Sequence, residues 1–171
     1  KPTIGSTPKS SAFTAIERLA SAVVASPVPF PYVPGLLSFR EAPPLLEALA
    51  RLPLIPDCLV VDAHGLAHPR RFGLACHLGV WCDIPTIGIA KSLLVGRHGP
   101  LGRARGSIAP LVDRGETVGA AVRTRAGVRP VYVSVGHRFD LSSACALALA
   151  LAPRFRIVEP IRAAHALVGV G

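Results

Sequence analysis

The chain has 171 residues, of which 50% are hydrophobic, so it is long enough to fold as one domain around a buried core. Its 19 lysines and arginines against 10 acidic residues give a net charge of +9, which favours a nucleic-acid partner unless it reflects an arginine-rich proteome. No apolar stretch reaches the roughly 20 residues that a membrane span requires, so we expect no integral membrane protein.

The four cysteines, Cys58, Cys76, Cys82 and Cys145, form no Cys-x-x-Cys pair. A zinc ribbon or a thioredoxin-type motif is therefore unsupported. Cys58 and Cys145 fall in apolar runs, where buried free thiols are common, so we predict reduced cysteines in the core. The first residues lack the pattern of a signal peptide, and we expect a cytoplasmic protein.

We predict a poorly defined lead-in over residues 1–26 and one α/β domain over residues 27–171. Residues 12–26 fit a helix or a short strand equally well. The next segment, from Pro27 to Pro34, holds four prolines and excludes a helix. Tyr32, held rigidly between prolines, is suited to wedging into a base stack, although a packed turn is the commoner role of such a segment.

A helix is predicted from Pro43 to Leu52, because proline is tolerated in a first turn and leucines follow. Glu41 falls at or before its start, where a carboxylate also serves as a cap or dipole partner. Residues 57–61 then read as a buried strand that ends at Asp62. Asp62 is either a catalytic or metal-binding carboxylate at a strand end or the cap of the next helix.

Residues 71–81 predict a second helix, and residues 85–90 a second buried strand that ends at Lys91. This strand–helix–strand unit predicts a right-handed parallel crossover, with Lys91 at the edge that carries Asp62. Residues 92–105 form a basic, glycine-rich loop in this interpretation. We therefore expect the two ionisable side chains to lie close together.

The C-terminal third predicts a hairpin of strands 118–124 and 130–135, turning about Ala126 and Gly127. The second strand leads to His137, and Asp140 is the expected N-cap of a helix that runs to Leu151. A short terminal helix follows Pro160. We expect His137 to join Asp62 and Lys91 at one sheet edge.

Such a cluster suits chemistry on phosphodiesters. Carboxylates bind Mg²⁺, which clamps a phosphodiester, while lysine and histidine stabilise charge or move protons. A metal-dependent nuclease uses all of these parts, and a phosphatase or sugar-phosphate enzyme would use similar ones. The sequence has neither a phosphate-binding loop of the Walker type nor a Gly-x-Ser-x-Gly motif.

Four segments together resemble the endonuclease V family, the deoxyinosine 3′ endonucleases. The first is Pro31-Tyr32-Val33-Pro34-Gly35-Leu36-Leu37-Ser38-Phe39-Arg40-Glu41, and the second runs from Asp62 to Gly73. The third is Pro85-Thr86-Ile87-Gly88-Ile89-Ala90-Lys91, and the fourth is Gly136-His137-Arg138. The resemblance extends from about Phe30 to Leu167 in the family's order and spacing.

The resemblance implies an RNase H-like α/β fold, in which one mixed sheet is flanked by helices in a single domain. It implies Mg²⁺-dependent cleavage, with Mn²⁺ as an alternative, of the second phosphodiester bond 3′ to deoxyinosine in DNA or inosine in RNA. The expected context is DNA repair by a monomer without a membrane partner. A non-catalytic homologue that binds inosine-containing nucleic acid is the alternative.

The resemblance also implies roles for individual residues. Asp62 and Glu41 would be metal ligands, and Lys91 and His137 would complete the catalytic set. The remaining assignments are a strand-separating wedge of Pro31, Tyr32, Val33 and Pro34, a base pocket of Gly35, Leu37, Ala63, Gly73 and Gly88, and nucleic-acid backbone contacts from Arg40, His68 and Arg70.

Two departures from the family pattern concern the site. The family's first strand carries Gly-x-Asp-Val, whereas no aspartate here precedes Asp57. We expect either that this strand is missing from the chain or that Glu17 substitutes, with weaker metal binding as the result. Ala63 also stands where the family has glycine, and its Cβ is expected to crowd the base pocket or to forbid a positive φ.

Overall fold

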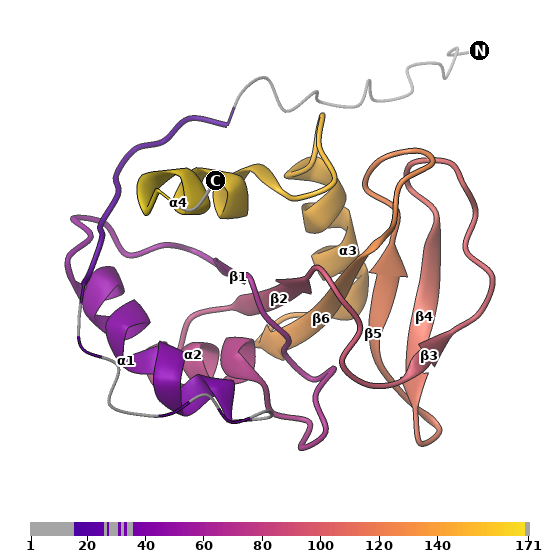
Figure 1. The fold of residues 1–171 in the computed structure, drawn as a ribbon, viewed down its shortest axis with the longest axis horizontal. Helices are drawn as coiled ribbons and strands as arrows, with labels where there is room; N and C mark the ends of the chain where they lie inside the picture. The colour runs from indigo at the N-terminus through magenta and orange to yellow at the C-terminus, as the bar shows by residue number, and fades with distance from the viewer. Residues whose placement is uncertain (1–15, 26, 28–30, 32, 34–35, 170–171) are drawn as a thin grey trace, which may run out of the picture.

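The computed structural model describes residues 16–25, 27, 31, 33 and 36–169 (Figure 1). Within this part, four helices flank a six-stranded sheet. The elements are α1 (Leu37–Ala50), β1 (Leu59–Val61), α2 (Leu74–Cys82), β2 (Thr86–Ala90), β3 (Arg97–His98), β4 (Ile108–Asp113), β5 (Glu116–Val122), β6 (Val131–His137), α3 (Leu141–Ala150) and α4 (Glu159–Leu167).

The sheet is mixed, with the strand order β1-β2-β6-β5-β4-β3. β1 and β2 run parallel and are joined through α2, whereas each of the other neighbouring pairs is antiparallel. The predicted α/β domain, with one mixed sheet and flanking helices, is therefore confirmed. The parallel pair is the part that matters most for the site, because both of its strands end at the same sheet edge.

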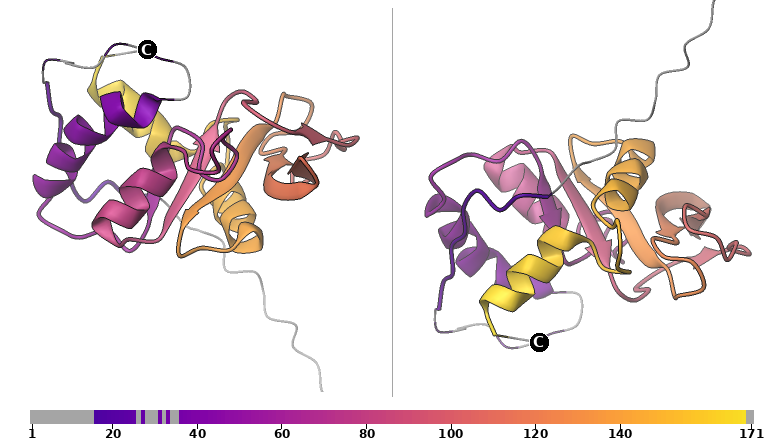
Figure 2. Two further views of the ribbon diagram at one scale, coloured as in Figure 1. Left: turned by 90° about the horizontal axis from the view of Figure 1, so that it is seen from below. Right: turned by 90° about the horizontal axis from the view of Figure 1, so that it is seen from above.

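The helices cover opposite faces of the sheet. α1 and α2 pack with the side chains of Leu59 and Val61 on one face. α3 and α4 pack with alternate residues of β2, β5 and β6 on the other face. Figure 2 shows α1 and α4 at the β1 end of the sheet and β3 at the far end. α4, the last helix of the chain, thus lies near the end of β1 that precedes Asp62.

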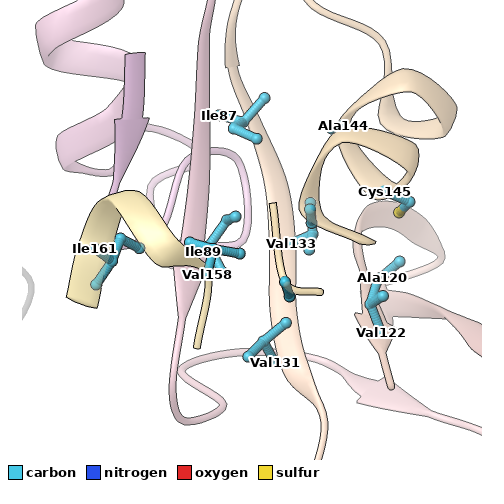
Figure 3. Packing of buried hydrophobic residues seen from close by; sticks show 12 residues of the cluster. Ile87, Ile89, Ala120, Val122, Val131, Val133, Ala144, Cys145, Val158 and Ile161 are labelled. Carbon is cyan, nitrogen blue, oxygen red and sulfur yellow. The ribbon is translucent and has the colours of Figure 1, made fainter. Parts of the chain in front are cut away.

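The larger core lies under α3 and α4 and consists of small and branched side chains (Figure 3). Ile87 and Ile89 of β2 meet Val131 and Val133 of β6, and all four are almost fully buried. Ile161 anchors α4 to this cluster. The continuous burial of β2 explains why its sequence reads as an uninterrupted apolar run.

α1 begins earlier than predicted. It starts at Leu37, so Pro43 and Pro44 lie inside the helix and Glu41 lies within it, not at its start. The two prolines cannot donate to the carbonyls one turn before them, which normally costs a helix stability. Packing compensates here, because buried Ala42 and the partly buried Leu46 join the cluster formed with α2 and β1. Tertiary contacts therefore override the local signal.

The predicted hairpin and the predicted capped helix are both confirmed. β5 and β6 pair across a turn in which Gly127 has φ +72°, and Asp140 accepts a hydrogen bond from Ser143 N at 2.9 Å. The prediction lacked β3 and β4, of which β3 falls in the segment predicted as a loop. Proline disfavours a central strand, but Pro110 of β4 pairs with β5 on one side and lies beyond the two residues of β3 on the other.

Residues 16–25 form neither helix nor strand, so neither alternative for them is seen. All four cysteines are described and free, as predicted; Cys145 is buried, whereas Cys58 is only half-buried. Burial raises the pKa of the Cys145 thiol to about 11. In the described residues, no helix is long and apolar enough to cross a membrane.

Candidate active site

Asp62, immediately after β1, is the centre of a cluster of ionisable side chains. Its Oδ2 atom lies 2.8 Å from Lys91 Nζ, which follows β2, and 2.9 Å from His165 Nε2 of α4. The three side chains are partly exposed, so the cluster faces solvent. The predicted meeting of Asp62 and Lys91 at one edge is confirmed, because parallel strands bring their carboxyl ends together.

Glycines allow the loop after Asp62 to lie directly on the sheet. A Cβ atom at Gly88 would lie 2.4 Å from the carbonyl oxygen of Ala63, and one at Gly65 would lie 2.0 Å from that of Val135. Gly65 N also donates a buried hydrogen bond of 2.8 Å to Ser134 Oγ. The backbone that carries Asp62 is therefore fixed by close approach to β2 and β6.

Ala63 fits this loop without strain. Its side chain is buried, and its φ is not among the positive φ angles of the described residues. The departure from glycine at this position therefore demands no left-handed backbone. Gly73 has a comparable role to Gly88, since a Cβ atom there would lie 2.2 Å from the carbonyl oxygen of His64.

The predicted place of His137 is wrong. β6 runs antiparallel to β2, so His137 lies opposite Thr86, the first residue of β2. Lys91 follows the last residue of β2, about 16 Å farther along the strand at the usual rise of a β-strand. His137 Nε2 instead lies 3.0 Å from Asp83 Oδ1, where α2 ends. Hydrogen bonds from His137 and Arg138 hold the pKa of Asp83 below its usual value.

His165 takes the position beside Asp62 that was predicted for His137. Sequence reasoning missed it, because α4 follows all strands and its place over the sheet depends on non-local packing. One signal was available: His165 stands four residues after Ile161, and residues four apart share a helix face. Since Ile161 is buried against the core, that face points toward the sheet.

Glu41 has no described contact with Asp62. Its carboxylate lies 3.4 Å from Arg40 Nε, so these two predicted residues pair with each other on α1. Among the described residues, no three His, Cys, Asp or Glu side chains form a group that could hold a metal ion. Asp62 and His165 do converge, and one carboxylate with a neighbouring imidazole fits a divalent ion whose other ligands are water and phosphate.

A cavity of about 350 Å³ lies between the start of α1 and the loop before α2. Two predicted base-pocket residues are neighbours of lining residues in the sequence: Leu37 lies between Leu36 and Ser38, and Gly73 follows Phe72. Arg70 at this cavity is exposed, whereas His68 is buried and its Nδ1 accepts from Arg70 N at 3.3 Å. The lining residues are Leu36, Ser38, Phe39, Arg70, Phe72 and His77.

The predicted wedge lies largely outside the described residues. Tyr32, Pro34 and the base-pocket residue Gly35 are not among them. Pro31 and Val33 are described and exposed. The wedge therefore stays a prediction.

Three histidines near the Asp62 loop favour their neutral forms. Burial lowers the pKa of His64, and a hydrogen bond with the Ser92 main chain opposes that effect. Burial lowers the pKa of His68 as well, with further contributions from Arg70 and His77. The pKa of His77 is lowered by burial alone. These three imidazoles are thus mainly uncharged at neutral pH.

The model of the endonuclease V family matches residues 9–166, most of the chain. This chain belongs to the endonuclease V family. The endonuclease V of Roseiflexus sp. (strain RS-1) is 58% identical over 160 residues, which cover 94% of this chain and 72% of that protein. Such relatives are nucleases, which hydrolyse phosphodiester bonds.

Solved endonuclease V structures share the fold. The structure from Streptomyces avermitilis has a TM-score of 0.79 at 56% identity, over 82% of this chain and 61% of that one. A Ciona intestinalis endonuclease V, in complex with a 24mer DNA containing an inosine followed by a ribo-adenosine, has a TM-score of 0.70 at 28% identity, over 82% of this chain and 66% of that one. This chain spans less than two thirds of the Streptomyces structure.

Proposed function

We propose that this chain acts as a metal-dependent endonuclease of DNA repair that cleaves the second phosphodiester bond 3′ to deoxyinosine, or to inosine in RNA. The observation that carries the proposal is the convergence of Asp62, Lys91 and His165 within a chain of the endonuclease V family. Net positive charge suits a polyanionic substrate.

Asp62 and His165 would hold a Mg²⁺ or Mn²⁺ ion, with Glu41 of α1 as a further carboxylate. When bound, the ion supplies Lewis acidity and lowers the pKa of a coordinated water. Lys91 places its ammonium group 2.8 Å from Asp62 and is exposed. It can therefore contact a phosphate oxygen while it keeps the carboxylate oriented.

Base recognition would use the segment from Pro31 to Leu37 and the adjoining cavity. Tyr32 would separate the strands, and an extrahelical hypoxanthine would enter between the start of α1 and the loop before α2. Extrusion of a base costs a few kcal/mol and is least costly for a weakly paired one such as inosine. Arg40 and Arg70 would contact the nucleic-acid backbone. The Ciona complex supports inosine-containing nucleic acid as the substrate class.

The deciding experiment is a nicking assay on a duplex with one deoxyinosine, and on a matched RNA with inosine, in Mg²⁺, in Mn²⁺ and in EDTA. We expect one nick 3′ to the inosine that requires the metal and is lost in the Asp62→Ala variant. Binding to the inosine duplex without nicking in either metal would overturn the proposal. A duplex with guanosine at the same position is the substrate control.

A further inference from the structure

Arg156 lies in the connector between α3 and α4 and contacts the end of β2. Its Nη2 atom donates to the carbonyl oxygen of Lys91 at 2.5 Å and to that of Pro130 at 2.8 Å. Its Nε atom donates to the carbonyl oxygen of Arg129 at 2.9 Å. One guanidinium thus joins the residue after β2 to the residues before β6.

These contacts involve main-chain carbonyls and no carboxylate among the described partners of Arg156. Burial lowers the pKa of Arg156, nearby Arg129 lowers it further, and Tyr132 raises it. A partly buried cation without an acidic partner is costly, so charge neutralisation does not explain its position. The rigid fork of donors instead matches several carbonyls at once.

The contacts occur where the strand ladder stops. β2 and β6 pair as far as Ala90 and Tyr132, so Lys91 lies just beyond the ladder. Pro130 has no amide hydrogen with which β6 could extend it. Arg156 supplies a side-chain donor at this point. The main chain of Lys91 is therefore held by Arg156 and not by strand pairing.

The same connector also leads to His165. Thr124, which is buried just beyond the end of β5, donates from Oγ1 to the carbonyl oxygen of Arg156 at 2.7 Å. α4 begins at Glu159, three residues after Arg156, and carries His165 to Asp62. Arg156 thus links the core to the main chain of Lys91 and, through the connector, to the helix that carries His165.

We propose that Arg156 is a positioning residue that fixes Lys91 and α4 relative to each other, so that Lys91 and His165 meet on Asp62. It touches none of the reacting atoms and acts through the main chain of Lys91. The proposal rests on the proposed nuclease function and goes beyond it by assigning a residue that lies outside all four signature segments.

The test compares Arg156→Gln with Arg123→Gln in the full chain. Arg123 is a matched control, because it also donates to carbonyls, those of Gly102, Leu101 and Val128, and has no described contact with the Asp62 cluster. We expect Arg156→Gln to lower kcat for nicking about 10- to 100-fold with KM unchanged, the range typical of lost support for catalytic groups. Arg123→Gln should retain kcat.

Arg156→Lys, which can still donate to the carbonyl of Lys91, should restore part of kcat. Amide hydrogen exchange provides a readout that does not need turnover: Arg156→Gln should accelerate exchange at residues 90–92 and 159–165, and Arg123→Gln should not. Equal losses of kcat in both glutamine variants, or unchanged exchange in both segments, would overturn the positioning role. A wild-type chain that does not nick while the exchange pattern holds would refute the nuclease proposal alone.

Discussion

His165 Nε2 lies 2.9 Å from Asp62 Oδ2, which joins the last helix of the chain to the end of the first described strand. Lys91 Nζ lies 2.8 Å from the same oxygen. One carboxylate oxygen is thus contacted by a side chain of α4 and by the side chain of the residue that follows β2. Any movement of α4 relative to the sheet should therefore disturb the candidate site directly.

Replacement of the two histidines by alanine should separate their roles. His165→Ala should lower the nicking rate by about 10²-fold or more, because a group at the reacting centre is lost. His137→Ala should leave the rate within a few-fold of the wild type, since His137 pairs with Asp83 at the opposite end of β2. Single-turnover nicking at saturating metal measures both effects. The interpretation fails if the two variants lose the same activity.

Asp83 should contribute to stability in a defined pH range. His137 and Arg138 lower its pKa in the folded chain, so the unfolded chain binds more protons below the usual value of 3.8. The contribution is therefore present above that value and is lost as the pH falls through the lower folded pKa. Because the pair is exposed, salt should weaken the effect. Urea unfolding between pH 6 and pH 3 measures the free energy of unfolding of the wild type and of Asp83→Asn. The difference between the two proteins should shrink as the pH falls; a difference that is the same at every pH would contradict this account.

Gly88→Ala should disrupt the loop that carries Asp62. The added Cβ would lie 2.4 Å from the carbonyl oxygen of Ala63, and backbone cannot yield as a flexible side chain can. Overpacking of this kind typically costs about 1–3 kcal/mol of unfolding free energy. Gly99→Ala is the matched control, because nothing lies within 4 Å of its Cβ position. Chemical denaturation of both variants measures the difference, and equal midpoints would show that the loop can move away.

The sequence could predict the part of the site that depends on one strand–helix–strand unit, namely Asp62 and Lys91. Asp62 and Lys91 each end a buried strand of one strand–helix–strand unit, and the parallel pairing of such units follows from a general rule. His137 also ends a strand, but the hairpin that contains it reverses the strand direction relative to β2. A residue at the end of a strand can therefore be assigned to a site only when the direction of that strand in the sheet is known. The direction depends on which strand it pairs with.

The remaining errors have the same origin in long-range packing. α1 continues through Pro43 and Pro44 because Ala42 and Leu46 are packed against other elements. β4 contains Pro110, which is tolerated because the two residues of β3 do not extend to it and so require no hydrogen bond from it. His165 reaches Asp62 because the connector after α3 places α4 near the sheet. None of these contacts is visible in a local window of sequence.

Three neutral histidines, two in the loop after Asp62 and one in α2, should make the fold sensitive to mild acid. Folding lowers the pKa of His64, His68 and His77 below the usual value of 6.5, so the unfolded chain binds more protons just below that pH. The free energy of unfolding should be nearly constant between about pH 7 and pH 8 and should fall as the pH drops from 6.5 through the folded pKa values. His68→Asn should reduce this slope, since its amide oxygen can still accept from Arg70 N, as His68 Nδ1 does at 3.3 Å, but carries no titratable group. Urea unfolding midpoints at pH 7.5, 6.5 and 5.5 measure the slope, and an identical slope in wild type and variant would show that His68 is not one of the groups responsible.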